Sequence, residues 1–365
     1  MKKIGVFTFF QTNYGAVLQA FALQKYLQEQ PETEVEIIDF TTPAHLEDHK
    51  IFQKQKGTNL LSIIAYYLFT LLRYRQLKRR VSRTWDFKKQ YFHFTRRYSS
   101  MKDVIENHPK EDIYITGSDQ VFNPNAKYVS VYYLDFDKGN GKKVAYAPSF
   151  GISEFSEDIT AKIEGYIKDF DYLSCREPAG AEYLKSITGY NVPVVVDPVL
   201  LHGAEEWSKI AISPSYKKDY IFIYDLNGAE NLVKIAKNIQ THTHLPIVCL
   251  TRNRMKKYTV DKQIYDAGPA EFIGWIEKAS FVVTDSFHGT VFSLIFGREF
   301  FTFIALEKTS ARIKNILSQV GFEDRIVTKD ELKTFNYLSF DKIKNADILS
   351  YLSQNSKDYI QSFLK

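Results

Sequence analysis

Short apolar runs alternate along the chain with segments in which apolar residues recur at helical spacing. Residues 4–9 (IGVFTF) form an apolar run that indicates a buried strand. From Ala16 onward the apolar residues follow helical spacing, and residues 35–40 (VEIIDF) form a second apolar run. A strand, a helix and a strand in this order predict parallel strands joined by a crossover helix. The same pattern predicts further strands at 112–116, 143–147, 172–175 and 192–196.

A second series of the same kind begins near residue 219. A helix is expected at 269–279, where Pro269 suits the first helical turn. Around it, apolar runs predict strands at 219–226, 246–250, 280–284 and 299–306. Strands that alternate with helices in both series indicate an α/β protein with two parallel sheets.

The two series predict two Rossmann-like domains. We expect the first domain at residues 1–200, with an insertion at 50–100 that is apolar and then basic, and the second domain at 201–340. An amphipathic segment at the end of the chain predicts a helix within 341–365 that packs back across the boundary between the domains. A length of 365 residues agrees with this division, because one hydrophobic core seldom serves a chain of that size.

Composition narrows the class of protein. A hydrophobic fraction of 44% excludes general disorder, and a net charge of +5 is too small to indicate a nucleic-acid-binding protein. The two cysteines, Cys175 and Cys249, lie in apolar runs and suggest neither a disulfide framework nor a zinc site. The first residues lack the small-residue cleavage site of a signal peptide. These features predict a cytoplasmic protein.

Polar residues gather where the predicted strands end, which is where ligands bind in open parallel sheets. The strand at 280–284 is followed by Asp285, Ser286 and His288, and the strand at 172–175 is followed by Arg176. Turn chemistry accounts for Asp and Ser at such places but not for His and Arg. A single His is more often structural, yet a His and an Arg at equivalent places in two domains favour an active site.

The residues after Ser286 predict a helix that starts beside His288, since the apolar positions from Thr290 onward follow helical spacing. Backbone N–H groups at a helix N-terminus attract phosphate or carboxylate. Arg176 adds a planar guanidinium that suits the same anions. Lys308, Ser310 and Arg312 either form a second cationic wall or are the solvated start of a helix.

Seven blocks of sequence, taken together and in order, resemble the polysaccharide pyruvyl transferase family. They are NYGAVLQAFALQKYL, ITGSDQVFNP, KVAYAPSFG, LSCREPAGAEYL, VVVDPVLL, ASFVVTDSFHGTVFSLIFG and KTSARIKNIL. The resemblance implies a fold like that of type B glycosyltransferases, with the active site between two Rossmann-like domains. It also implies transfer of pyruvate from phosphoenolpyruvate to sugar hydroxyls, with formation of a cyclic ketal, in bacterial surface polysaccharide biosynthesis. No cofactor and no metal are expected beyond this co-substrate.

The resemblance also implies roles for individual residues. Arg176 matches an arginine that binds the phosphoenolpyruvate anion, and His288 matches the catalytic histidine. Some members carry an arginine where this chain has Ser286, so Arg312, Lys308 or Arg252 would have to supply that charge. We expect backbone N–H groups at Ser286, Phe287 and Gly289 to hold the anions, and Asp119 or Asp285 to act as the base. The remaining expected residues face the acceptor or shape the floor of the cleft: Asn13, Tyr14, Gly15, Ser118 and Gln120. The other interpretation of Asp119 is that it caps a helix.

Residues 60–83 raise the question of a membrane surface. The apolar stretch 60–72 is too short to span a bilayer, which needs about 20 residues. It is followed by six basic residues within 73–83. Such a segment either lies on an anionic membrane, close to an acceptor carried on polyprenyl diphosphate, or forms a buried helix followed by a solvated one. The first interpretation would place the protein at the inner face of the cytoplasmic membrane.

Two other functions fit the same sequence. One is a glycosyltransferase of type B architecture that uses a nucleotide sugar. The other is a non-catalytic partner in a glycan-assembly complex, which the serine at position 286 favours. The sequence leaves both open.

Overall fold

The computed structural model describes residues 1–53, 59–126, 128–136, 139, 141–152, 154–305, 311–339 and 348–365. The chain forms two compact units. The first contains residues 1–48, 88–202 and 348–365, and the second contains residues 49–87 and 203–347. Residues 49–87, which sequence analysis placed within the first domain, therefore cluster with the second unit.

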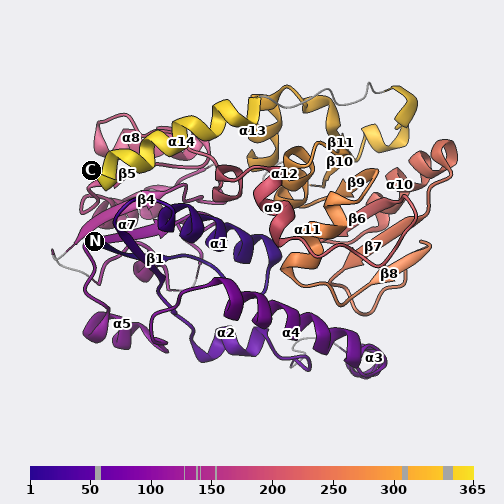
Figure 1. The fold of residues 1–365 in the computed structure, drawn as a ribbon, viewed down its shortest axis with the longest axis horizontal. Helices are drawn as coiled ribbons and strands as arrows, with labels where there is room; N and C mark the ends of the chain where they lie inside the picture. Colours follow the sequence, from indigo (N-terminus) through magenta and orange to yellow (C-terminus); the bar gives the residue numbers. More distant parts are fainter. Residues whose placement is uncertain are drawn as a thin grey trace. The chain divides into compact units, whose positions relative to one another are not determined.

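The sheet of the first unit contains five parallel strands in the order β2-β1-β3-β4-β5 (Figure 1). They are β1 (Lys2–Phe7), β2 (Thr33–Ile37), β3 (Ile113–Gly117), β4 (Lys142–Tyr146) and β5 (Tyr172–Leu173). The helices of this unit are α1 (Tyr14–Gln28), α2 (Pro43–Asp48), α5 (Met101–Asn107), α6 (Val129–Tyr132), α7 (Glu157–Ile167), α8 (Pro178–Thr188) and α14 (Ile348–Leu364). A short 3-10 helix, η1, covers Pro198–Leu201.

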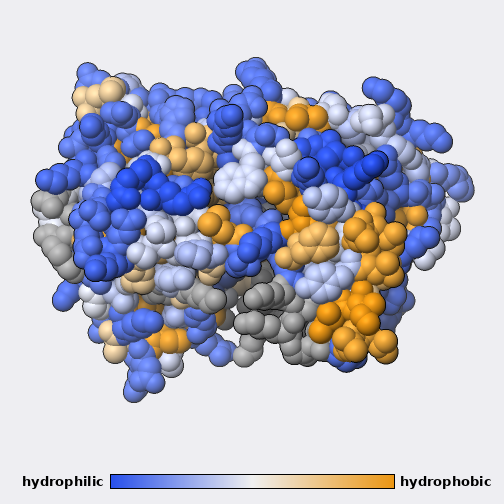
Figure 2. Space-filling model, turned by 90° about the horizontal axis from the view of Figure 1, so that it is seen from below, coloured by the Kyte–Doolittle hydropathy of each residue, from blue (hydrophilic) through white to orange (hydrophobic). Residues whose placement is uncertain are grey.

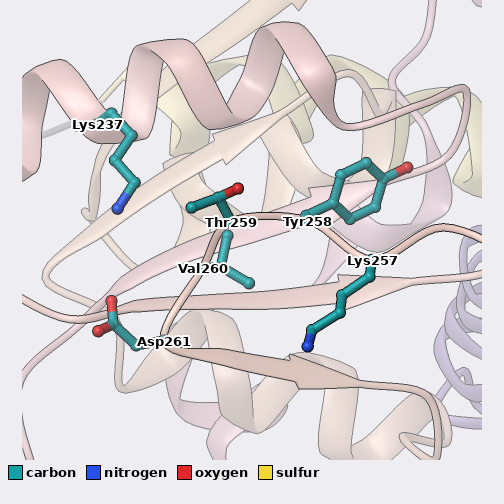
Figure 3. Close-up of a pocket in the computed structure, with 6 residues that line it drawn as sticks. All are labelled: Lys237, Lys257, Tyr258, Thr259, Val260 and Asp261. Atoms are coloured by element: carbon teal, nitrogen blue, oxygen red, sulfur yellow. The ribbon is translucent and has the colours of Figure 1, made fainter.

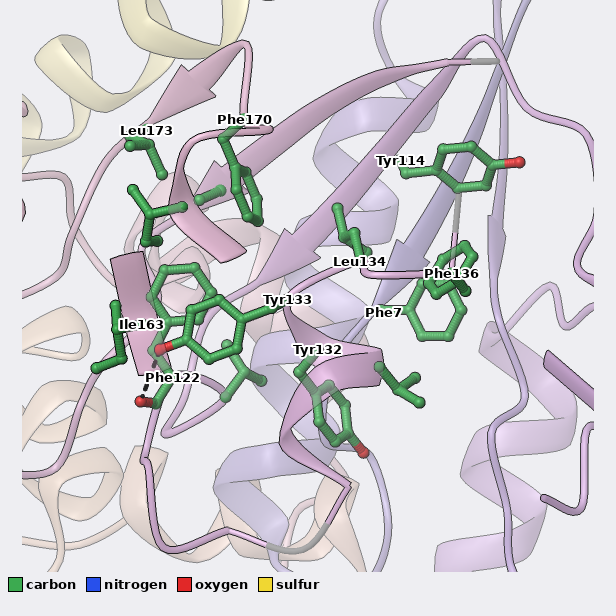
Figure 4. Packing of buried hydrophobic residues seen from close by; sticks show 14 of the residues in the cluster. Phe7, Tyr114, Phe122, Tyr132, Tyr133, Leu134, Phe136, Ile163, Phe170 and Leu173 are labelled. Carbon is green, nitrogen blue, oxygen red and sulfur yellow. Dashed lines mark hydrogen bonds between the residues drawn. The ribbon is translucent and has the colours of Figure 1, made fainter. Parts of the chain in front are cut away.

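Each face of the first sheet packs against helices. Gly117 lies under α1, where an added Cβ would come within 2.5 Å of Leu23. The other face carries an aromatic core in which Phe122 and Tyr133 stack with ring centroids 4.2 Å apart (Figure 4). The hydroxyl of Tyr133 donates to the carbonyl of Phe122, which satisfies a polar group buried in this core.

Helix α14 completes the first unit. The hydroxyl of Tyr359 donates to the carbonyl of Ala145 at 3.0 Å, and Ser356 accepts from the N–H of Val196 at 2.9 Å. The end of the chain is thus fixed beside β4 and the segment that follows β5.

The sheet of the second unit contains six parallel strands in the order β11-β10-β9-β6-β7-β8. They are β6 (Ile221–Asp225), β7 (Ile247–Thr251), β8 (Lys262–Ile264), β9 (Phe281–Thr284), β10 (Glu299–Ile304) and β11 (Ile326–Thr328). Its helices are α3 (Leu60–Leu72), α9 (Ala204–Ile210), α10 (Glu230–Thr243), α11 (Pro269–Glu277), α12 (Phe287–Ile295) and α13 (Ala311–Val320). The 3-10 helices η3, η4 and η5 cover Glu323–Arg325, Glu331–Lys333 and Tyr337–Ser339.

Helix α4 (Tyr74–Tyr91) begins in the second unit and ends in the first. In the second unit, α10 covers one face of the sheet with a buried aliphatic row that includes Leu232, Ile235 and Ile239. The opposite face is aromatic: Phe222 stacks on Trp275 of α11 with ring centroids 6.0 Å apart. The two faces bury the sheet from both sides, as expected for parallel strands.

The prediction of two parallel-sheet α/β units is confirmed, and most strands lie within a few residues of their predicted positions. The strand predicted at 192–196 is wrong, because only Val194 pairs there, in an isolated bridge with Cys175. Pro193 has no N–H to donate, so a ladder cannot continue through it. The edge strands β8 and β11 escaped prediction since each contains only three residues.

Candidate functional site

Each sheet has one place where the strand order reverses, and most of the predicted polar residues lie there, whereas Arg176 follows β5 and Arg312 follows β10. In the first sheet the reversal falls between β1 and β3, and in the second between β6 and β9. Loops at the carboxyl ends of such strand pairs form the crevice in which ligands bind in open α/β sheets. Residues 8–13 and 118–123 occupy this position in the first unit, and residues 226–229 and 285–288 occupy it in the second.

Asp285 joins the two loops of the second unit. Its Oδ1 accepts from the N–H of Leu226, and its Oδ2 accepts from both the backbone N–H and the side-chain amide of Asn227, at 2.9–3.0 Å. Burial raises the pKa of Asp285 above its ordinary value, although the N–H donors of Leu226 and Asn227 oppose the shift. The carboxylate therefore holds the loop after β6 in place, and its role as a base stays a prediction.

Ser286 starts α12 as its N-cap. Its Oγ accepts from the N–H of Gly289 at 3.3 Å, so this side chain serves the helix end. Position 289 requires glycine because the backbone passes close to the side chain of Thr284. An added Cβ would lie 2.5 Å from Oγ1 of Thr284. That hydroxyl cannot easily move, because it donates to the carbonyl of Tyr224 and accepts from the N–H of Ser286.

His288 lies in the first turn of α12, between the capped end and the apolar part of the helix. Its side chain is only 7% exposed, and its ring lies edge-on to that of Phe287 with centroids 5.2 Å apart. The guanidinium of Arg312, at the start of α13, lies 5.7 Å from the Phe287 ring. The second unit thus brings an imidazole, a helix N-terminus and a guanidinium into one neighbourhood. Lys308 and Ser310 lie outside the described residues, and Arg252 follows β7.

Arg176 is the centre of a buried charge network in the first unit. Its guanidinium, 4% exposed, is paired with Asp197 at 2.5 Å, Glu177 at 3.4 Å and Asp119 at 3.9 Å. Burial lowers the pKa of Arg176, but the neighbouring Glu177, Asp197 and Asp119 carboxylates more than offset this and raise it above its ordinary value. The arginine therefore carries its charge inside the protein and is held there by three acids.

The network includes the loop after β3. Ser118 donates from Oγ to Asp197 at 3.2 Å, and Asp119 adopts a φ of +65°, a left-handed conformation that aspartate tolerates better than most residues. The carbonyl of Asp119 accepts from the N–H of Ser149, which ties this loop to the one after β4. Gln120 accepts from the side chain of Asn123. The chain turns here and the next helix starts only at Val129, so Asp119 does not cap a helix.

The loop after β1 brings Asn13, Tyr14 and Gly15 to the start of α1. Asn13 is the N-cap of this helix and accepts from the N–H of Gly15 at 3.0 Å. Tyr14 and Gly15 are buried. These residues lie at the carboxyl end of β1. That they shape the floor of a cleft or face an acceptor stays a prediction.

Sequence analysis did not single out Lys88, which the structure places at this same loop. The Nζ of Lys88 donates to the carbonyl of Gln11 at 2.6 Å and lies 5.4 Å from the ring of Phe10, and the residue is 1% exposed. Burial lowers the pKa of Lys88 to about 7; Arg97 lowers it further and Asp39 opposes the shift. The sequence gives only a weak signal for this burial, the apolar Phe87 directly before Lys88 in a basic helix.

The buried ammonium predicts a pH-dependent stability. Below about pH 7 Lys88 is protonated in both states and the cost of burying its charge is fully present. Between about 7 and the ordinary value of 10.5 the folded state releases the proton first. The free energy of unfolding should therefore rise with pH, by at most about 1.4 kcal/mol per pH unit from this group.

Urea unfolding of the Lys88→Met variant, measured from pH 6 to 9, tests this expectation. The variant should lack the rise that the unchanged protein shows. Lys89→Met, at the exposed neighbouring position, should keep it. Equal slopes for the unchanged protein and Lys88→Met would show that folding does not lower the pKa of Lys88.

A surface cavity of 460 Å³ lies elsewhere in the second unit. Figure 3 shows its lining, with Lys237 on α10 and residues Lys257 to Asp261 on the segment before β8. Asp261 precedes β8 and accepts from the N–H of Ile247 at the start of β7. The cavity therefore adjoins the amino ends of these strands, opposite the carboxyl ends at which His288 lies. Within the described ranges, no three His, Cys, Asp or Glu side chains are grouped to hold a metal ion.

Comparison with known proteins gives a family and a fold. The family model described as polysaccharide pyruvyl transferase matches residues 13–305. None of the curated proteins matches the chain. Among solved structures, the S. aureus MnaA–UDP co-structure is similar at 15% identity, with a TM-score of 0.53 over 100% of this chain and 97% of the other.

A UDP-N-acetylglucosamine 2-epimerase from Rickettsia bellii is similar at 10% identity, with a TM-score of 0.53 and the same two coverages. At such identities the likeness shows the fold alone. It supports the predicted fold class, in which two Rossmann-like units resemble the type B glycosyltransferases.

Proposed function

The chain belongs to the polysaccharide pyruvyl transferase family, and from this membership we propose that it moves pyruvate from phosphoenolpyruvate to two hydroxyls of a sugar, forming a cyclic ketal. The acceptor would be a unit of a bacterial surface polysaccharide, carried on polyprenyl diphosphate. The transferred group comes from the donor itself, so the proposal includes neither a cofactor nor a metal.

The observation that carries the proposal is the position of His288. It stands in the first turn of α12, at the strand-order reversal of the second sheet, with Arg312 close to the adjacent Phe287. A helix N-terminus stabilises a carboxylate or phosphate, and both occur in phosphoenolpyruvate. An imidazole at the same end of the helix is suited to exchange a proton with a molecule bound there.

The reaction would proceed by general acid and base catalysis. His288 protonates the methylene carbon of the donor, and the first sugar hydroxyl forms a bond to the neighbouring carbon while it gives up its proton. The second hydroxyl then forms a bond to that carbon, and the bond to the phosphate oxygen breaks. Of the two hydroxyl protons, one balances the proton gained by the methylene carbon, and the other leaves with phosphate.

Asp119 and Asp285 are the proposed bases. Burial raises the pKa of Asp285, which makes it a better proton acceptor than an exposed aspartate, but both of its oxygens already accept N–H donors. The side chain of Asp119 is 17% exposed, which leaves its carboxylate within reach of a substrate. We therefore place Asp119 first and treat Asp285 as the residue that positions the loop beside His288.

Phosphate release from phosphoenolpyruvate, measured against a panel of lipid-linked sugars, tests the function. We expect release that depends on one acceptor, together with a rise in melting temperature when phosphoenolpyruvate is added, since a ligand at 100 times its dissociation constant stabilises a protein by about 2.7 kcal/mol. UDP is the control ligand. Stabilisation by UDP alone, without phosphate release for any acceptor, would contradict the proposal and favour a nucleotide-sugar glycosyltransferase.

A further inference from the structure

Helix α3 presents its apolar residues outward. Seven of them are 40–78% exposed: Leu60, Leu61, Ile64, Tyr67, Leu68, Leu71 and Leu72. The buried positions of the helix are instead Tyr66 and Thr70. A helix on the surface of a globular protein normally turns its apolar side toward the core. In α3 that arrangement is reversed.

Polar contacts fix this orientation. Arg254 donates from Nη1 to the carbonyl of Ile51 at 2.6 Å, to the hydroxyl of Tyr66 at 3.1 Å and to Oγ1 of Thr70 at 3.4 Å. The guanidinium also lies 5.0 Å from the Tyr66 ring. Arg254 thus holds the inner side of α3 against the rest of the second unit. The fold therefore fixes the outward direction of the apolar face.

The exposed residues form one apolar surface. Figure 2 shows hydrophobic residues gathered in a patch on one side of the molecule, where α3 lies in Figure 1. Phe52 extends it, with its ring stacked at 6.1 Å from both Tyr67 and Tyr74. Contiguous exposed apolar patches on soluble proteins mark sites of interaction with a protein or a membrane.

The charges beside this surface indicate whether its partner is a protein or a membrane. Six basic residues follow within 73–83, and Asp86 is the only acidic residue in 59–91. Arg79 and Arg83 pair with Asp266. Arg75 and Lys78 are exposed and form no ion pair with any residue that the structure describes. An apolar helix face with unpaired cations at its end is complementary to a surface of anionic lipid.

We propose that α3 and the first turns of α4, residues 60–78, dock this protein on an anionic membrane. The helix α3 would lie in the plane of the interface, with its leucines at the acyl boundary, while Arg75 and Lys78 contact the head groups. A helix of 13 residues is too short to cross a bilayer, which needs about 20. Among the described residues no membrane-crossing helix is found. The proposal does not depend on the reaction that the protein catalyses.

Flotation of the full chain with vesicles tests the docking. One set of vesicles contains phosphatidylcholine with a third of phosphatidylglycerol, and the other contains phosphatidylcholine alone. We expect binding to the anionic set that weakens as salt is added. Leu61→Ser combined with Leu71→Ser should reduce binding by roughly tenfold or more, since each exposed leucine contributes apolar area. Arg75→Glu combined with Lys78→Glu should reduce it by a similar factor.

Matched controls lie on the same unit. Leu338→Ser removes an equally exposed leucine, and Lys217→Glu combined with Lys218→Glu reverses two exposed charges, both away from α3. These variants should bind as the unchanged protein does. All the substituted side chains are exposed, so the fold should persist, which circular dichroism and melting temperature can verify.

Three results would overturn the proposal. The first is no binding of the unchanged protein to the anionic vesicles. The second is equal binding of the α3 variants and the controls. The third is a dimer in solution that the Leu61 and Leu71 substitutions dissociate, without vesicle binding, which would assign the surface to a second copy of the chain. Phosphate release from phosphoenolpyruvate with a soluble acceptor should be unchanged in the α3 variants, so a failure of docking stays distinct from a failure of the proposed reaction.

Discussion

Replacement of His288 by glutamine should slow phosphate release from phosphoenolpyruvate by about 10²–10⁴-fold, the usual contribution of a positioned general acid or base. Glutamine keeps much of the volume of the buried ring, so the packing against Phe287 changes little. It cannot exchange a proton at neutral pH. The expected result is a loss in kcat with a smaller change in the Michaelis constant for phosphoenolpyruvate.

Three measurements determine whether the loss of activity in His288→Gln comes from the missing proton donor. The melting temperature of His288→Gln should stay within a few degrees of the original value, which excludes unfolding as the cause. His242→Ala, at an exposed position of the same unit, should retain full activity. Asp285→Asn, which keeps the acceptor for Leu226 on one side only, should lower activity with a loss of stability. Equal activity of His288→Gln and the unchanged protein would exclude His288 as the acid.

The sequence predicted the location of the candidate residues in the second unit, between a strand and a helix, because these residues are consecutive. Asp285 to Gly289 follow a buried strand and start a helix, so a local pattern is enough to place them at the carboxyl end of β9. Arg312 lies 24 positions after His288, and sequence analysis grouped it with the candidate site only because it follows a predicted strand. What sequence could not give is the direction of each side chain, and in particular that the oxygens of Asp285 are bound to the loop after β6.

Features that depend on contacts distant in sequence escaped prediction. Lys88 looks like its exposed neighbour Lys89, and only the packing of α4 against the loop after β1 distinguishes them. The sequence left the outward apolar face of α3 as one of two alternatives, since an apolar run of 13 residues fits a buried helix equally well. In that case the deciding contact comes from Arg254, more than 180 positions away in the chain.

The position of Arg176 after a strand does not by itself decide whether it binds the donor. It follows β5 as predicted for a donor-binding residue, but its guanidinium pairs with Asp197, whose side chain is fully buried. Asp197 also accepts from Ser118 and from the N–H of Val199, so the arginine connects the loop after β3 with the start of η1. Direct contact with phosphoenolpyruvate and a positioning role through Asp119 therefore predict different results for the same substitution.

Arg176→Met should lower the free energy of unfolding by about 3–5 kcal/mol, because it leaves the buried Asp197 without its partner. Arg176→Met combined with Asp197→Asn should recover part of this loss, since the most deeply buried of the three carboxylates is then neutral. Arg96→Met is the control: this exposed arginine pairs with Asp103 on the surface, where water screens the charges, so its loss should change the free energy of unfolding far less. Urea unfolding measures all three variants.

The stable double variant then separates the two roles of Arg176. If the guanidinium binds the donor, the Michaelis constant for phosphoenolpyruvate should stay high in the double variant, because restored folding does not replace the lost cation. If Arg176 acts only through the loop at Ser118 and Asp119, recovery of stability should bring that constant back toward its original value. Unfolding energies of Arg176→Met and Arg96→Met that agree within about 1 kcal/mol would contradict the buried network itself, since they would place both arginines in similar surroundings.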